Sequence, residues 1–226
     1  MSIAHLNGAI AQANTATGKS TSAAGATVFS VSSGATINSG AEAAFETLLD
    51  SETKGLITLA DQNLTVDSGS ISVANAKLLA ATTTGTVTAS IDTTESVDSL
   101  KTLYDTGETN AYTITITSNA ADTQLSTAAE FNAINNATSV AVNATSVTAL
   151  ASSDISDIKT LLTAGNDTDQ FTATSFSSLA TVAVADSTLD VSDLNDSIAQ
   201  ANTATGGTST TFTISSGGTI NGGTAA

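Results

Sequence analysis

The sequence lacks several residues on which common protein chemistries depend. Its 226 residues include no cysteine, no proline and no tryptophan, and aromatic residues make up only 4%. Without cysteine there can be no disulfides and no thiol chemistry, and without proline the elements are expected to run uninterrupted. Hydrophobic residues still make up 40% of the chain, chiefly Ala, Val, Ile and Leu. These small side chains predict thin, repetitive core layers.

Basic residues are also scarce. Five Lys and Arg stand against 21 Asp and Glu, for a formal net charge of −16. Such a chain is expected to repel nucleic acid, because it has no basic patch to neutralise phosphates. No apolar run is long enough to span a bilayer, so we expect no membrane insertion. The N-terminus also lacks the charged and apolar regions of a signal peptide.

The chain ends by repeating its beginning. LNDSIAQANTATG at Leu194–Gly206 nearly matches LNGAIAQANTATG at Leu6–Gly18, 188 positions earlier. FTISSGGTINGG at Phe212–Gly223 echoes FSVSSGATINSG at Phe29–Gly40, 183 positions earlier. Internal repetition of this kind fixes the architecture. We therefore predict a single repeat domain over 1–226, with homologous end segments at 1–40 and 189–226.

Strands and helices are predicted to alternate between these ends. The expected helices are 2–16, 41–54, 73–82, 95–104 (ended by Gly107), 127–135, 155–163 and 191–204. The expected strands are 27–31, 36–38, 64–66, 86–91, 112–117, 139–143, 171–176, 181–185 and 211–215. This alternation predicts an α/β protein with a parallel sheet and right-handed crossovers. Steps of about 22–32 residues favour a right-handed parallel β-α solenoid, with strands on one face and helices on the other.

Catalysis is not expected from this sequence. His5 is the only histidine, so a catalytic triad would have one available base. It falls in the first turn of a predicted helix, and its counterpart in the second copy is Asp193. The chain contains no dinucleotide-binding glycine motif, no P-loop, no HExxH and no Cys/His cluster. We predict that the protein is not an enzyme and needs no organic cofactor.

Calcium is the one ligand that the acidic residues suggest. The loop AGNDTDQF places Asn166, Asp167 and Asp169 just after a predicted helix, and oxygen ligands suit Ca²⁺. The loop matches neither an EF-hand nor the glycine-rich nonapeptide of calcium β-rolls. Acidic residues in such places also cap helices or lie favourably near helix N-termini. Helix capping and calcium binding are both open interpretations.

Threonines recur at alternate positions of the predicted strands. In YTITIT at 112–117 the isoleucines would point inward and the threonines outward, because side chains alternate along a strand. Val87, Ala173 and Phe212 are expected to point inward in the same way. Stacked coils would then align a flat threonine array that resembles ice-binding solenoids, made of Thr86, Thr88, Thr113, Thr115, Thr172, Thr174, Thr211 and Thr213. The alternative is an ordinary solvated sheet face, where Thr is a favoured residue.

A solenoid exposes strand edges and coil interior at both ends, and this sequence has no obvious polar cap. Two arrangements would cover the ends: neighbouring residues of a longer protein, or head-to-tail stacking with a second copy of the chain, a contact that need not close. Both arrangements predict a spacer or fibre element whose ends contact similar repeat segments, either in the same protein or in a second copy.

The runs SISVANAKLLAATTTGTVTASI and NAYTITIT, with the absence of Cys and Pro, resemble repeats in giant secreted surface proteins of marine bacteria, cyanobacteria especially. The resemblance covers most of the chain and lies in composition and cadence; phage tail-fibre material is similar in composition. It implies secretion and a role in the outer cell layer, adhesion or motility. We therefore expect an extracellular, cell-surface structural element. The alternative is a ligand-binding surface for ice or calcium.

Overall fold

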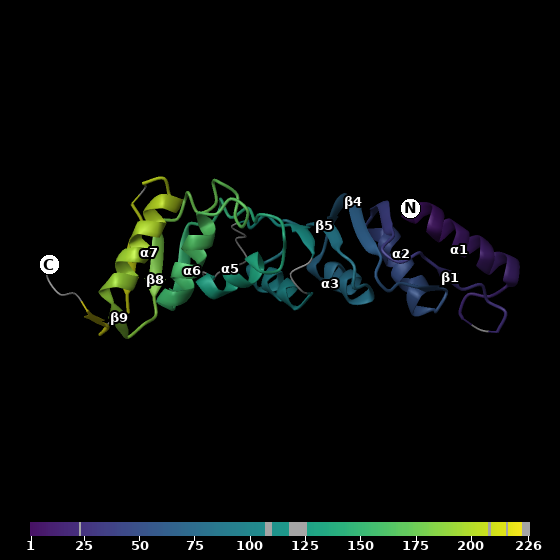
Figure 1. Ribbon diagram of the computed structural model, residues 1–226, viewed down its shortest axis with the longest axis horizontal. Helices are drawn as coiled ribbons and strands as arrows, with labels where there is room; N and C mark the ends of the chain where they lie inside the picture. The colour runs from purple at the N-terminus through teal and green to yellow at the C-terminus, as the bar shows by residue number, and fades with distance from the viewer. Residues whose placement is uncertain (23, 107–109, 118–125, 208, 216, 223–226) are drawn as a thin grey trace. The chain divides into compact units, whose positions relative to one another are not determined.

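A computed structural model describes residues 1–22, 24–106, 110–117, 126–207, 209–215 and 217–222, with the backbone alone at 104–106 (Figure 1). The chain divides into two compact units. Unit 1 comprises Met1–Asp92 and Asp105–Thr113, and unit 2 comprises Thr93–Tyr104 and Ile114–Ala226. Both units combine helices with parallel strands, which confirms the predicted α/β class.

The described residues of unit 1 form three α-helices and two parallel sheets. The helices are α1 (Ile3–Thr17), α2 (Glu42–Thr53) and α3 (Val73–Thr82). One sheet has the order β2-β4-β5-β6, and β1 pairs with β3. The strands are β1 (Phe29–Ser30), β2 (Thr36–Ala41), β3 (Ile57–Thr58), β4 (Asn63–Ile71), β5 (Val87–Ile91) and β6 (Ala111–Thr113).

The larger sheet of unit 1 is built from segments that lie one strand and one helix apart in the sequence. Thr36 of β2 lies opposite Asn63 of β4, and Leu64 of β4 lies opposite Val87 of β5. Parallel neighbours of this kind need a crossover connection, and α2 and α3 supply two of them. The helices pack in the same order, α1 against α2 and α2 against α3 (Figure 1). Each strand and its helix therefore add one layer to the unit.

The core of unit 1 depends on strand alternation. Along β5 the side chains of Val87, Ala89 and Ile91 are buried, whereas Thr88 and Ser90 lie between them on the other face. Alternate residues of a strand point to opposite faces, so one face is apolar and the other polar. The helices bury an apolar stripe against the apolar face, and removal of this surface from water stabilises the layer.

Unit 2 contains the remaining elements. Its helices are α4 (Val97–Leu100), α5 (Ala128–Asn135), α6 (Ile155–Gly165) and α7 (Val191–Ala204). A 3₁₀ helix at Lys101–Thr106 follows α4, and its last two residues, Asp105 and Thr106, belong to unit 1. Its strands are β7 (Ala149–Ser153), β8 (Thr181–Val184), β9 (Thr188–Asp190), β10 (Thr211–Ile214) and β11 (Thr219–Asn221). The sheets have the orders β7-β8-β10 and β9-β11.

Pairing in unit 2 is also parallel and joins successive segments. Thr181 of β8 lies opposite Ala149 of β7 on one side and opposite Thr211 of β10 on the other. An isolated parallel bridge joins Thr115 to Asn143. The helices α5, α6 and α7 pack side by side in chain order (Figure 1). Unit 2 thus repeats the construction of unit 1.

Three phenylalanines fill the centre of unit 2. The ring of Phe176 lies edge-on to that of Phe131, with centroids 6.2 Å apart, and 5.0 Å from the ring of Phe171. Aromatic pairs favour such tilted and edge-to-face arrangements. The predicted strand at 171–176 is wrong, because only Phe171 forms a bridge and the chain then turns, leaving Ala173 exposed rather than inward. The turn directs both Phe171 and Phe176 into the core.

Other predicted elements are shorter than expected. The helix expected at 95–104 is regular only at Val97–Leu100 and is capped by Ser96; Gly107 lies outside the described residues. The strand expected at 139–143 is reduced to bridges at Val142 and Asn143. The sequence does not predict β3, β7, β9 or β11, because ALASS and the two- and three-residue strands carry no clear alternation.

Candidate functional site

The predicted calcium loop is engaged in hydrogen bonds of its own. Asn166 caps α6 and donates from Nδ2 to the carbonyl of Gln200 (3.2 Å) and to its Oε1 (2.6 Å). The carboxylate of Asp167 accepts from the amide of Asp169 (3.0 Å) and from Nε2 of Gln170 (3.1 Å). Within the described ranges no three His, Cys, Asp or Glu side chains come together as a metal cluster. Calcium binding stays a prediction.

The acidic residues around α7 have identifiable partners. Asp190 caps the helix by accepting from the amide of Ser192 (2.8 Å), and hydrogen bonds from the hydroxyl and amide of Ser192 hold the pKa of Asp190 below its usual value. Asp196 and Asp193 pair with Lys159 of α6 at 2.9 and 3.2 Å, and they raise the pKa of Lys159. These groups tie α7 to α6.

Similar polar contacts join the earlier helices. In unit 1, Glu42 of α2 accepts from the amide of Ser72 (3.0 Å) and from Nδ2 of Asn75 (2.7 Å), which together lower its pKa. In unit 2, Lys101 pairs with Glu130 of α5 at 2.7 Å. Burial raises the pKa of Glu130, but the hydrogen bonds from Lys101 and Thr127 together outweigh it and the net pKa is lowered. Charges on this chain therefore fasten neighbouring helices to one another.

A groove of about 510 Å³ lies over α5 and α6. Its lining residues are Asn132, Asn135, Asn136, Ile155, Ser156, Lys159, Thr160, Thr163, Ala164, Gln170 and Asp193. The amides and hydroxyls among them could hydrogen-bond a polar ligand. Ser156 lies one turn from Lys159, whose pKa is raised by hydrogen bonds from its amine to Asp196 and Asp193. His5 is exposed on α1 in unit 1.

The strand register does not bring the predicted threonine ladder together. Thr88 lies opposite Ala111, and Thr113 lies opposite Ser90. Thr211 lies opposite Thr181, which is outside the predicted set. Of the other ladder residues, Thr86 precedes β5, Thr115 bridges Asn143, Thr172 and Thr174 lie at the turn after Phe171, and Thr213 lies opposite Ala183. Among the described strand pairs no two of the eight are register partners, so ice binding gains no support.

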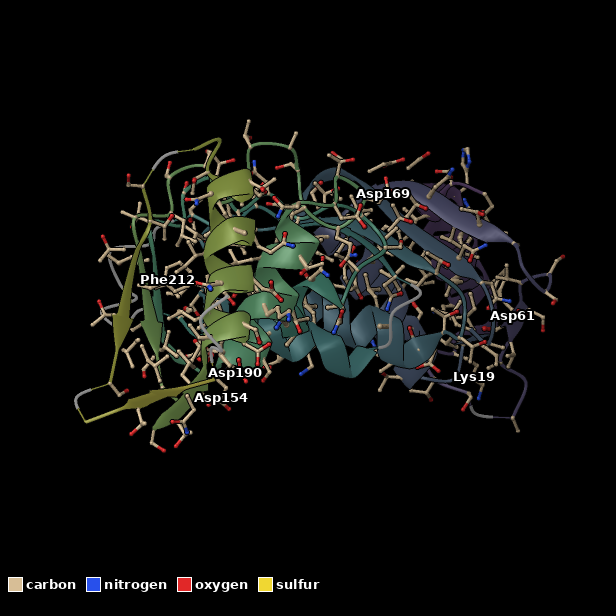
Figure 2. The ribbon with its side chains drawn as sticks, turned by 60° about the vertical axis from the view of Figure 1, so that its left-hand side comes forward. Lys19, Asp61, Asp154, Asp169, Asp190 and Phe212 are labelled. Atoms are coloured by element: carbon tan, nitrogen blue, oxygen red, sulfur yellow. The ribbon has the colours of Figure 1, made fainter. Side chains whose placement is uncertain are left out.

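Unit 2 ends at an apolar strand edge. β10 is the outer strand of its sheet and carries Phe212 (Figure 2). Phe212, expected to point inward, is only half-buried, whereas its register partner Val182 is buried. On β11, Ile220 is 49% exposed, although its partner Leu189 is buried. The reason is that β10 and β11 have a strand partner on one side only in the described chain. Within the described residues the apolar side chains of β10 and β11 are therefore only partly covered.

No protein-family model, curated protein or solved structure compared with this chain matches it. Among the described helices, none has both the length and the apolar character needed to cross a membrane.

Proposed function

We propose that this chain is an extracellular structural repeat element, a spacer or filament-forming segment of a cell surface, and that it is not an enzyme. The observation that carries the proposal is the parallel pairing of successive segments in both units, each pair of strands being joined through a helix. A chain that repeats one strand–helix layer grows by addition of layers and needs no catalytic cleft.

The finer architecture that we propose is one right-handed β-α solenoid running through both units. Strand–helix–strand connections between parallel strands are almost always right-handed, and the helices of each unit pack in chain order. The test is small-angle X-ray scattering. A compact chain of 226 residues would have a radius of gyration of about 17 Å, and a solenoid requires a clearly larger value. A measured radius that matches the compact chain would contradict the solenoid.

The polar side chains support a structural role. Glu42, Lys101 and Lys159 each join neighbouring helices through hydrogen bonds or ion pairs. The net charge of −16 makes copies of the chain repel one another, whereas the outer strands carry the exposed Ile220 and the half-buried Phe212 and Ile214. This distribution favours association through the ends of the chain over association through its sides, and we propose head-to-tail contact between copies.

The surface location rests on the resemblance to secreted bacterial repeat proteins. An antibody against this chain should label intact cells of the organism that encodes it. Labelling confined to permeabilised cells would refute the surface role, whatever the architecture. The alternative function, a ligand-binding surface, predicts measurable thermal hysteresis for an ice ligand. A concentrated solution without hysteresis would end that alternative for ice.

A further inference from the structure

The two end coils of the chain have equivalent pairing. Under the offsets of the sequence echo, Ser2 corresponds to Asp190 and Asn38 to Asn221. Ser2 forms a parallel bridge to Asn38, and Asp190 lies opposite Asn221 in the parallel β9–β11 pair. In both coils the residue just before the helix therefore pairs with the equivalent residue of the later strand. The segments 1–38 and 189–221 are the same structural coil.

The backbone at the two ends agrees in detail. Gly18 and Gly206, which come after α1 and α7, both have left-handed φ values, of 65° and 63°. Ser39 has the unusual value of 65° for a non-glycine residue, and its counterpart Gly222 has 81°. Left-handed φ is strained for serine and free for glycine, so its recurrence reflects one common turn.

The end helices differ in which face is covered. Leu6 and Ile10 of α1 are 6% and 2% exposed. Their counterparts on α7, Leu194 and Ile198, are only half-buried. The sequence on this face is unchanged between the copies, so the difference comes from the element that packs on it. In unit 1 the covering element is α2, which packs directly against α1.

Residues beside these on the same side of each helix show the reverse pattern. On α7, Ser197 and Ala201 are fully buried, on the helix that packs against α6. Their counterparts on α1, Ala9 and Ala13, are exposed and half-buried. The buried stripe of α7 is therefore rotated toward α6 relative to the buried stripe of α1, and Leu194 and Ile198 lie at its less covered margin. In the described chain, no layer equivalent to α2 covers the C-terminal coil.

The strands give the same result. Ile37 on β2 is fully buried and lies opposite Leu64 of β4. Its counterpart Ile220 on β11 is 49% exposed. The segment that covers the N-terminal coil consists of α2, β3 and β4, residues 42–71. The C-terminal coil would accept a surface of this same shape and sequence.

We infer that residues 42–71 of a second copy bind the C-terminal coil, 189–221, in exchange for that copy's own N-terminal coil, 1–41. This inference rests on the proposed end-to-end role and names its partner surface. The incoming coil has nearly the same sequence and pairing as the coil that it displaces, so residues 42–71 keep equivalent contacts, whereas the displaced N-terminal coil loses its cover. Repeated from copy to copy, it continues the period of the sequence echo without a break.

The hydrogen bonds of unit 1 specify the exchanged contact. Within the chain, the amide of Phe29 donates to the carbonyl of Leu56 (2.8 Å), and Nδ2 of Asn7 donates to the carbonyl of Ala44 (2.8 Å). The counterparts of the two donors are Phe212 and Asn195, and the side chain of Asn195 is exposed. Both donor types are therefore present on the C-terminal coil.

The same offsets predict two further contacts. The amide of Asn63 donates to the carbonyl of Ala35 (2.9 Å), whose counterpart is Gly218, and the amide of Ser39 donates to Asp67 (2.9 Å), where the C-terminal coil has Gly222. Strand register would place Thr219 opposite Asn63 of the second copy, as Thr36 is placed within the chain.

Simple stacking of intact copies fits less well. The outer edge of β2 is occupied, because the amide of Asn38 donates to the carbonyl of Met1 (2.9 Å) and Ser2 bridges to Asn38. A strand arriving from another copy would have to displace these residues. Exchange removes them together with the rest of the N-terminal coil. It is therefore expected to be slow and to accelerate under conditions that loosen that coil.

The first test is site-specific cross-linking of the full chain, which has no native cysteine. Thr219→Cys and Asn63→Cys chains are mixed at high concentration, incubated, and treated with a short bis-maleimide. Exchange predicts a cross-linked pair of chains. Replacing Asn63→Cys by Thr36→Cys is the matched control, because exchange removes Thr36 from the contact. A cross-link formed only with Thr36→Cys would overturn the exchange in favour of stacking.

The second test uses equivalent substitutions with opposite expected signs. Leu6→Ala loosens the N-terminal coil and should increase association, measured by light scattering over a concentration series. Leu194→Ala removes part of the intermolecular surface and should weaken association about tenfold, from the loss of roughly half a buried leucine. Equal effects of the two variants would contradict the inference.

Ile220→Asp provides a variant that preserves the monomer, since the side chain is 49% exposed. It should abolish association, whereas Leu78→Asp, which alters a 54% exposed leucine on α3, should leave it intact. Association that survives Ile220→Asp overturns the exchange but leaves the structural role standing. A chain that stays monomeric at every concentration refutes both the exchange and head-to-tail assembly, while surface labelling still tests location.

Discussion

Neighbouring coils of unit 1 approach each other closely at Gly85, and substitution there should be costly. A Cβ atom added to Gly85 would lie 2.4 Å from the carbonyl oxygen of Gln62 and 2.8 Å from that of Asp61. Contacts of Cβ below 3.0 Å are essentially absent from real structures, so Gly85→Ala requires the backbone to move. The obstacle is main chain, which cannot rotate aside as a side chain could.

The cost can be worked out from the contacts that this movement disturbs. The carbonyl of Gln62 accepts from Oγ1 of Thr83 (2.6 Å), and the amide of Thr84 donates to the carbonyl of Ala60 (2.7 Å). Overpacking costs about 1–3 kcal/mol, and each hydrogen bond that is lengthened or lost adds roughly 0.5–1.5 kcal/mol. We expect Gly85→Ala to lower the free energy of unfolding by about 2–4 kcal/mol.

Urea unfolding followed by circular dichroism measures this effect, with Gly8→Ala as the matched control. Gly8 lies in the interior of α1 with no atom within 4 Å of the added Cβ. Alanine is favoured over glycine in a helix, so the control should stabilise by about 0.5–1 kcal/mol. A Gly85→Ala chain that is as stable as the original would show that the coils can separate at this point, and the layer packing described for unit 1 would be refuted.

Three other predictions concern the stability of the chain and are tested by melting or unfolding. The pKa of Glu42 is lowered in the folded chain. Its contribution to the free energy of unfolding is therefore present above the ordinary glutamate pKa and is lost as the pH falls through the lower folded pKa. In thermal melts Glu42→Gln should destabilise the chain by roughly 1 kcal/mol at neutral pH, and this loss of stability should shrink as the pH is lowered. Thr127→Ala removes the capping box that Thr127 forms with Glu130 at the start of α5 and should cost about 1 kcal/mol in urea unfolding, whereas Thr127→Ser should cost much less. Calcium binding by the loop of Asn166, Asp167 and Asp169 predicts a higher melting temperature with millimolar calcium than with a chelator, and equal melting temperatures would contradict it.

Helices and their caps were the most predictable part of the fold. The helix expected at 191–204 is present with those bounds, and Ser72 caps α3 through the amide of Asn75. Both depend on local signals, since the capping residue and the apolar stripe lie within a few positions of one another. The parallel pairing could also be predicted, because it results from the alternation of strands and helices.

The strand register was not predictable in the same way. YTITIT has the clearest alternation in the sequence, yet it is a strand only at Ala111–Thr113, with a bridge at Thr115. The segment after Phe171 alternates as well, but there the burial of Phe176 outweighs strand propensity and the chain turns. The predicted threonine ladder depends on both properties: alternation predicts which face a residue occupies, whereas register depends on where the neighbouring strand begins.

The acidic residues show how a candidate site can prove to be structural. Asp193 has His5 as its counterpart in the first coil, and Asp196 has Gly8. The two aspartates face Lys159, because α7 packs against α6, whereas α1 packs against α2. Other residues that α7 directs toward α6 are unchanged between the copies: Gln200, which accepts from Asn166, corresponds to Gln12, and the buried Ala201 corresponds to Ala13. The aspartates therefore differ from their counterparts where a charged partner, Lys159, is present on the neighbouring helix, and their role is in helix packing.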